Sequence, residues 1–132
     1  MKIAIASDHG GFELKTALIE HLKGRNFEVD DLGTNGPESV NYPEFGKKCA
    51  EYVAAGKAIV TEPLYYEVPF GFSEKRNYIV YDDVGSLISK CDYLLDNVSE
   101  VHSMEENNRK YYAEHLRPDM LVKDTLIQAG IL

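Results

Sequence analysis

Cysteine is scarce in this sequence, and no long apolar run occurs in it. The two cysteines, Cys49 and Cys91, form no CxxC pair and have no histidine partner nearby, so we expect two buried structural thiols and no metal site. No apolar run approaches the roughly 18–20 residues that span a bilayer, and the N-terminal MKIAIASDHGG has no stretch long enough for a secretory signal. These absences favour a cytoplasmic protein without a cofactor.

Basic residues are also outnumbered. The chain has 14 lysines and arginines against 22 aspartates and glutamates, which gives a net charge of −8. A field of this sign repels phosphate backbones and anionic lipid headgroups, so we exclude nucleic acid and membrane surfaces as partners. A small anionic substrate is compatible with the sequence only where backbone amides or a helix N-terminus offset this field.

A chain of 132 residues, 44% of them apolar, fits one domain over residues 1–132. Short β-rich runs alternate with segments of helical periodicity. We predict strands at 2–7, 27–32, 58–61 and 78–81, and helices at 12–23, 43–55, 84–95, 98–116 and 118–129. This alternation indicates a three-layer α/β domain with a four-stranded parallel sheet. Right-handed crossovers give the order 2-1-3-4, as in flavodoxin-like and Rossmann-like folds.

Residues able to do chemistry gather where the first predicted strand ends, in Ser7-Asp8-His9-Gly10-Gly11. A strand that ends here and opens a helix places the amides of Gly10 and Gly11 at the carboxyl edge of the sheet, a geometry that favours a phosphate or a carboxylate. Asp8 and His9 flank these amides, and histidine can act as an acid or a base near neutral pH. The alternative is structural: an aspartate N-cap beside a surface histidine.

Three longer motifs carry a family resemblance. They are MKIAIASDHGGFELK at the N-terminus, VDDLGT at 29–34 and ESVNYP at 38–43. Together they resemble ribose-5-phosphate isomerase B and its galactose-6-phosphate isomerase relatives, almost continuously over residues 1–57. In that family the Asp-His pair after the first strand contacts the sugar phosphate, and the Tyr before Pro lines the same pocket. The resemblance implies these roles for Asp8, His9 and Tyr42.

The sequence departs from that family after the third predicted strand. Here the strand ends in Thr61-Glu62-Pro63, and no Gly-Thr-Gly follows. The family has a Cys-Gly-Thr-Gly type motif at this place, which supplies a catalytic thiol or neighbouring carboxylate and an anion cradle. Its downstream asparagine and phosphate-binding arginines have no counterpart either. Proton abstraction beside a carbonyl needs a base and a stabilised oxyanion, so we expect Asp8 and His9 to be vestigial for catalysis.

The second half follows another pattern. A glycine precedes the strand Ile59-Val60-Thr61, a loop follows, the next strand ends in Asp82, and a helix then carries a leucine on every turn. Residues 58–132 thereby resemble the C-terminal end of a group 1 glycosyltransferase of the two-Rossmann-domain type. The step Gly56-Lys57 satisfies both patterns, so a natural or engineered join there would preserve the packing of helix on strand. We interpret the chain as a chimera. The alternative is one natural, divergent family.

These resemblances predict a folded chimera without a complete active site. At most, phosphate or a sugar phosphate binds weakly at the end of the first strand, where the Glu62 carboxylate should repel it. The alternative is a sugar-phosphate aldose–ketose isomerase of the ribose-5-phosphate isomerase B type with residual activity. The isomerase family is dimeric, but much of its interface lies in the replaced part, so we expect a monomer or a new homodimer.

Aromatic residues crowd the loop after the third predicted strand, at Tyr65, Tyr66, Phe70 and Phe72. One interpretation is a platform on which a sugar stacks. The other is that these rings cover the end of the core.

Overall fold

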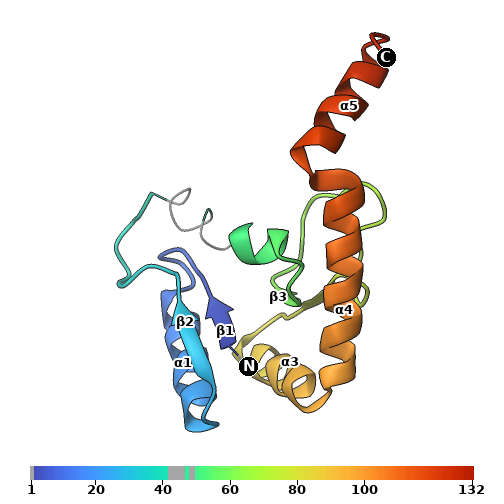
Figure 1. The fold of residues 1–132 in the computed structure, drawn as a ribbon. Helices are drawn as coiled ribbons and strands as arrows, with labels where there is room; N and C mark the ends of the chain where they lie inside the picture. The colour runs from blue at the N-terminus through green and yellow to red at the C-terminus, as the bar shows by residue number, and fades with distance from the viewer. Residues whose placement is uncertain (1, 42–46, 48–49) are drawn as a thin grey trace.

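The structure, a computed structural model of the chain, describes residues 2–41, 47 and 50–132. The elements in chain order are β1 (Lys2–Ile5), α1 (Phe12–Gly24), β2 (Glu28–Asp31), β3 (Ile59–Thr61), β4 (Tyr78–Val80), α3 (Val84–Asp96), α4 (Val98–Tyr111), the π-helical turn η1 (Tyr112–Leu116) and α5 (Pro118–Gln128). Residues 50–54 are also helical. The predicted α/β class is therefore confirmed, and these elements lie within a few residues of the predicted ones (Figure 1). Part of the helix predicted at 43–55 lies outside the described residues.

β1, α1 and β2 form one unit, which we call the N-terminal unit. β1 and β2 pair in parallel along their whole length. Parallel strands need a crossover, and α1 provides it. The inward stripe of α1 buries Leu18 and Leu22, and Leu22 is fully buried. Burial of this stripe against the strands is what makes the 13-residue helix stable.

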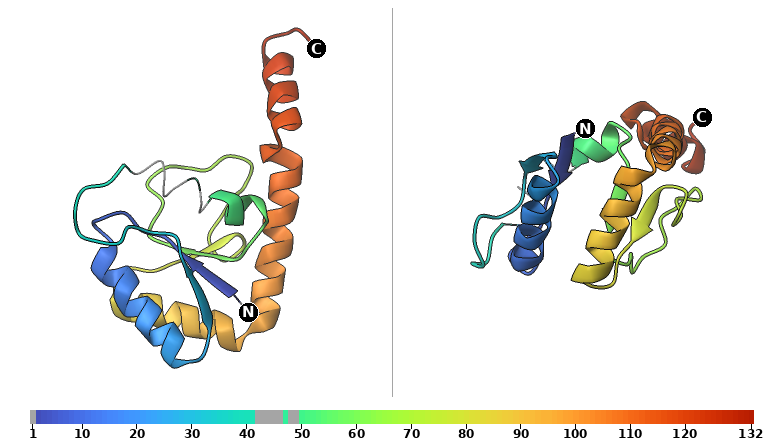
Figure 2. Two further views of the ribbon diagram at one scale, coloured as in Figure 1. Left: turned by 60° about the vertical axis from the view of Figure 1, so that its left-hand side comes forward. Right: turned by 90° about the horizontal axis from the view of Figure 1, so that it is seen from below.

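β3, β4, α3 and α4 form the C-terminal unit. β3 and β4 pair in parallel over three residues each. α3 begins with a capping box, in which the Asp83 carboxylate accepts from the backbone N–H of Ser86 and the Ser86 hydroxyl accepts from the backbone N–H of Asp83. Beyond η1, α5 extends away from the rest of the molecule, and none of its residues is buried (Figures 1 and 2).

A single core cluster joins the two units. α1 and α3 lie side by side, with the strands of each unit packed against them (Figure 2). The buried members of this cluster come from β1, α1 and α3: Ile5, Leu18, Leu22 and Leu87. A second cluster forms where α4 places Val101 and Met104 against Leu94 of α3. The two halves of the chain therefore bury apolar surface together.

The predicted four-stranded sheet in the order 2-1-3-4 is not what the structure contains. Among the described residues, β1 pairs only with β2 and β3 only with β4, in two separate parallel sheets. The strands have only three or four residues each, so a ladder between β1 and β3 would add few hydrogen bonds. Packing of α3 on α1 already covers the apolar faces of both units, and this side-chain packing replaces the missing ladder.

The predicted join at Gly56-Lys57 is packed tightly against α4. Gly56 has φ of +68°, and a Cβ there would lie 2.4 Å from Cγ of Arg109, so this position requires glycine. The Lys57 carbonyl accepts a hydrogen bond of 2.8 Å from Asn108 Nδ2, and Lys57 Nζ lies 3.0 Å from Glu105 Oε1. The join is therefore held by contacts from the C-terminal unit.

Candidate functional site

The turn after β1 is closed by its own aspartate. Asp8 Oδ1 accepts hydrogen bonds from the backbone N–H groups of Gly10, at 3.0 Å, and Gly11, at 3.3 Å. These two amides are therefore engaged by Asp8 in this structure, and anion binding at Gly10 and Gly11 stays a prediction. A phosphate that approaches them meets the Asp8 carboxylate first. The structural alternative predicted an aspartate N-cap; the N-cap of α1 is Gly11, and no side chain caps the helix, so Asp8 closes the turn before the helix instead.

His9 lies at the tip of this turn, beside the N-terminus of α1. Its side chain is exposed, whereas Asp8 is half-buried. The imidazole is therefore accessible to a solute, as a group that exchanges protons must be. Tyr42, the third residue that the family resemblance implicates, lies outside the described residues. The structure thus brings Asp8, His9, Gly10 and Gly11 together at the carboxyl end of β1.

A buried lysine supports the turn, and sequence reasoning missed it. The side chain of Lys15 is 3% exposed, and its Nζ lies 2.7 and 2.6 Å from the two carboxylate oxygens of Asp31. Asp31 Oδ1 also accepts from the backbone N–H of Gly33. This pair ties the first turn of α1 to the end of β2. The sequence does contain a signal for this burial: Lys15 precedes Leu18 by three residues, so it lies on the same inward face of the helix.

Two glycines let the chain close around Ser7, at the carboxyl end of β1. A Cβ on Gly33 would lie 2.7 Å from the backbone nitrogen of Ser7 and 2.8 Å from Cδ of Lys15, and a Cβ on Gly11 would lie 2.9 Å from Cβ of Ser7. The Ser7 carbonyl accepts from the backbone N–H of Thr34 at 3.1 Å. Glycine at these positions is thus what allows the loop after β2 to pack against the end of β1.

Glu62 lies at the carboxyl end of β3, in an open hollow of about 480 Å³. This hollow is lined by residues of α1, of the loop after β3, of the segment after β4 and of the start of α3: Leu14, Glu62, Pro63, Tyr65, Tyr81, Asp82, Asp83 and Val84. The Tyr81 hydroxyl donates to Glu62 Oε1 at 3.4 Å. Burial, together with the Glu62 carboxylate, raises the pKa of Tyr81 to about 12. Asp8 and His9 are not among the residues that line this hollow.

The aromatic loop divides into two parts. Phe70 stacks on His115 with ring centroids 4.4 Å apart, and Phe72 packs on Tyr78 and Tyr111. Phe72 and Tyr111 line an apolar cavity of about 250 Å³ next to η1, so the core-covering interpretation describes Phe72, whereas Phe70 is 53% exposed. Tyr65 and Tyr66, in contrast, are 89% and 88% exposed.

No metal-binding group is apparent in the part of the chain that the structure describes. Within residues 2–41, 47 and 50–132, no three His, Cys, Asp or Glu side chains converge closely enough to hold an ion. None of the helices in these ranges is long and apolar enough to cross a membrane. Cys91 is partly buried against the core cluster, and burial raises its pKa to about 11. Cys49 lies outside the described residues.

Comparison with known proteins identifies the family. The sequence model of the Ribose/Galactose Isomerase family matches residues 3–61. A putative sugar phosphate isomerase of Rickettsia bellii is 50% identical over 46 residues, 35% of this chain and 32% of its own length. Galactose-6-phosphate isomerase subunit LacB of Clostridium acetobutylicum is 41% identical over 107 residues, 76% of this chain and 61% of its own length.

A solved structure, ribose-5-phosphate isomerase B of Clostridium thermocellum, superposes with a TM-score of 0.53 at 31% identity, over 84% of this chain and 99% of that chain. The chain belongs to the ribose/galactose isomerase family. The predicted isomerase resemblance is thereby confirmed. The LacB similarity spans 107 residues and therefore extends beyond residue 57, so a glycosyltransferase origin of residues 58–132 stays a prediction. The matched segment covers only 32% of the Rickettsia protein.

Proposed function

We propose that this chain is a sugar-phosphate aldose–ketose isomerase of the ribose-5-phosphate isomerase B type, with slow turnover at the turn after β1. The observation that carries the proposal is the position of His9. It lies exposed on a turn that Asp8 holds closed, at the carboxyl end of β1 and next to the N-terminus of α1. Ligands of open α/β folds bind at this edge, and the family match includes this segment.

The reaction needs a group that carries a proton between neighbouring carbons or their oxygens. Histidine does this near neutral pH. Asp8 and the Lys15–Asp31 pair keep the turn in place, which positions the imidazole. Glu62 is the carboxylate at the end of β3, and it is our candidate for the base that removes the carbon-bound proton.

Slow turnover follows from two features of the site. Gly10 and Gly11 donate to Asp8, so they are poor donors for a phosphate or a developing oxyanion. The second feature is repulsion between the Glu62 carboxylate and the phosphate of the substrate. At a separation of about 4 Å near a surface, two such charges repel by up to about 4 kcal/mol. This equals the binding free energy of a millimolar ligand, about 4 kcal/mol. We therefore expect millimolar or weaker binding. One missing oxyanion donor alone lowers the rate by about 10²-fold or more.

Conversion of ribose 5-phosphate to ribulose 5-phosphate tests the proposal. We expect slow turnover that falls by about 10²-fold or more in His9→Ala, as loss of an acid–base group does. His102 is exposed on α4, so His102→Ala is the matched control and should retain activity. Equal rates in His9→Ala and in the unsubstituted chain would overturn the proposal.

The second candidate is a chimera that binds a sugar phosphate without converting it. Two observations favour it: the family match ends at residue 61, and β3 then leads into Glu62-Pro63 rather than a glycine-rich cradle. Chemical-shift titration with phosphate distinguishes the two candidates when turnover is absent. Shifts centred on residues 8–11 that grow in Glu62→Gln favour this candidate, and micromolar affinity or shifts elsewhere contradict it.

A further inference from the structure

The N-terminal and C-terminal units meet through their helices. No strand ladder joins the two sheets in the described part of the chain. Among the described helices and strands, the one extensive contact between the units is α1 against α3. This helix pair therefore contributes to the docking of the two units, together with the hydrogen bond of 2.8 Å that the Tyr52 hydroxyl donates to Asp30 of β2.

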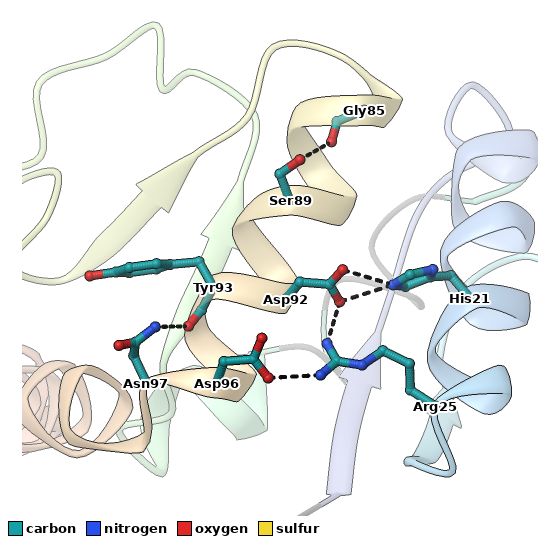
Figure 3. A network of polar contacts seen from close by, with 8 residues as sticks. All are labelled: His21, Arg25, Gly85, Ser89, Asp92, Tyr93, Asp96 and Asn97. Atoms are coloured by element: carbon teal, nitrogen blue, oxygen red, sulfur yellow. Dashed lines mark hydrogen bonds and ion pairs between the residues drawn. The ribbon is translucent and has the colours of Figure 1, made fainter.

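A cluster of four charged and polar side chains lies at this contact (Figure 3). His21 Nε2 of α1 lies 2.9 and 3.2 Å from the carboxylate oxygens of Asp92 of α3. Arg25 donates to the same Asp92 carboxylate through one guanidinium nitrogen and to Asp96 through another, at 2.8 Å. Figure 3 shows His21 pointing toward Asp92, and Arg25 lying between Asp92 and Asp96.

The charge balance of this cluster depends on His21. With the imidazole neutral, one cation, Arg25, faces two carboxylates; with it protonated, two cations face two carboxylates. The other element packed on α1 is β2, and its carboxylates pair elsewhere, Asp31 with Lys15 and the other two with Lys2. The histidine is therefore the group in this contact that can change charge near neutral pH.

We propose that His21, Arg25, Asp92 and Asp96 form a pH-sensitive latch that docks the N-terminal unit on the C-terminal unit. Protonation of His21 converts its hydrogen bond to Asp92 into an ion pair and tightens the docking. The candidate proton-transfer groups, His9 and Glu62, lie on different units, so the latch also controls how far apart they lie. That consequence, unlike the latch itself, rests on the proposed function.

The pH range in which the latch stabilises docking also has a lower limit. The hydrogen bond from His21, and then that from Arg25, hold the pKa of Asp92 below its usual range. A carboxylate with a lowered pKa stabilises the docked state above the ordinary aspartate range, and this stabilisation is lost only as the pH falls through the lowered value. Docking therefore weakens when the pH falls through the lowered pKa of Asp92.

The chain carries its own reporter of docking. Cys91 precedes Asp92 on α3 and packs against the core cluster shared by the two units. Burial raises the pKa of this partly buried thiol to about 11, so we expect a thiol reagent to attack it faster when α1 and α3 separate. Cys49→Ser leaves Cys91 as the single thiol of the chain.

The test compares labelling rates of Cys91 in the Cys49→Ser chain with and without His21→Gln. Glutamine can still donate to Asp92 but cannot take up a proton. The ratio of the two rates cancels the intrinsic pH dependence of the thiol. The side chains of His21 and Asp92 are 30% and 33% exposed, so their ion pair is worth little. We therefore expect the ratio of the His21→Gln rate to the rate with His21 present to rise by about two- to fivefold from pH about 8.5 to about 6.

Two controls make the result specific. His102→Gln removes an exposed histidine that also faces a carboxylate, Glu105, but on α4 away from the contact, and its ratio should stay near one at both pH values. In an Asp92→Asn background, His21→Gln should no longer change the ratio with pH. A ratio that does not change with pH would overturn the latch. This includes the case in which His21→Gln destabilises the whole chain equally at both pH values. So would a rise that persists in the Asp92→Asn background.

Discussion

Replacing Asn108 by alanine should destabilise the protein more than any neighbouring substitution on α4. Asn108 is 4% exposed, and its Nδ2 donates to the carbonyls of Lys57, at 2.8 Å, and Asn77, at 2.9 Å. Its Oδ1 accepts from Nδ2 of Asn77, which is 2% exposed. One side chain thus satisfies groups at the predicted join before β3 and in the turn before β4.

The size of the effect follows from the groups left without a partner. Asn108→Ala leaves the side-chain N–H and the carbonyl of Asn77 buried and unsatisfied, and each such group costs about 1–3 kcal/mol. The expected loss is therefore about 2–6 kcal/mol, a large part of the roughly 5–15 kcal/mol that holds a typical domain folded. With a urea m-value of about 2 kcal/mol/M, the midpoint should fall by about 1–3 M.

Urea unfolding followed by circular dichroism measures this shift, and Asn107→Ala is the matched control. Asn107 is the preceding residue of the same helix, and its Nδ2 makes one exposed hydrogen bond of 3.2 Å to the carbonyl of Arg76. The control should change stability by no more than about 0.5–1 kcal/mol. Equal midpoints for the two variants, at unchanged m-value, would refute the reasoning.

Two further predictions concern the shared core and the thiol. Leu22→Ala removes a fully buried side chain and should lower the free energy of unfolding by about 2–5 kcal/mol, as measured in urea. Leu121→Ala, on the exposed α5, should change it little. Because burial raises the pKa of Cys91 to about 11, its neutral form favours folding, and stability should fall as the pH rises from about 9 toward 11. Thermal unfolding of Cys91→Ala in the same alkaline range should lack that part of the decline.

Local signals in the sequence predicted the elements well. The capping of α3 by Asp83 depends on residues within one turn, and Gly56 ends the helical segment with a positive φ that glycine adopts readily. The predicted helix at 98–116 is also present, although its last turn, Tyr112–Leu116, is π-helical. Such features are encoded by neighbours in the chain, which is why one sequence suffices to find them.

Non-local pairing was the part that the sequence did not predict. Whether β1 pairs with β3 depends on how α1 and α3 pack, and no local pattern reports that. The ion pair of Lys15 with Asp31 was missed for the same reason, since 16 residues separate its partners. At the candidate site, the gathering of Asp8 and His9 followed from adjacency, but the use of the Gly10 and Gly11 amides by Asp8 required the coordinates.

Exchange of the substrate's C2 proton is the most direct test of the proposed chemistry. Aldose–ketose isomerisation through an enediolate removes that proton, so ribose 5-phosphate in D2O should lose its C2 proton signal in the NMR spectrum when the enzyme is added. This readout detects proton abstraction even when net conversion is slow. We expect exchange above the buffer rate with the unsubstituted chain, and exchange near the buffer rate with Glu62→Gln, which lacks the candidate base. Buffer-rate exchange with the unsubstituted chain at millimolar substrate, or undiminished exchange with Glu62→Gln and His9→Ala, would contradict the account.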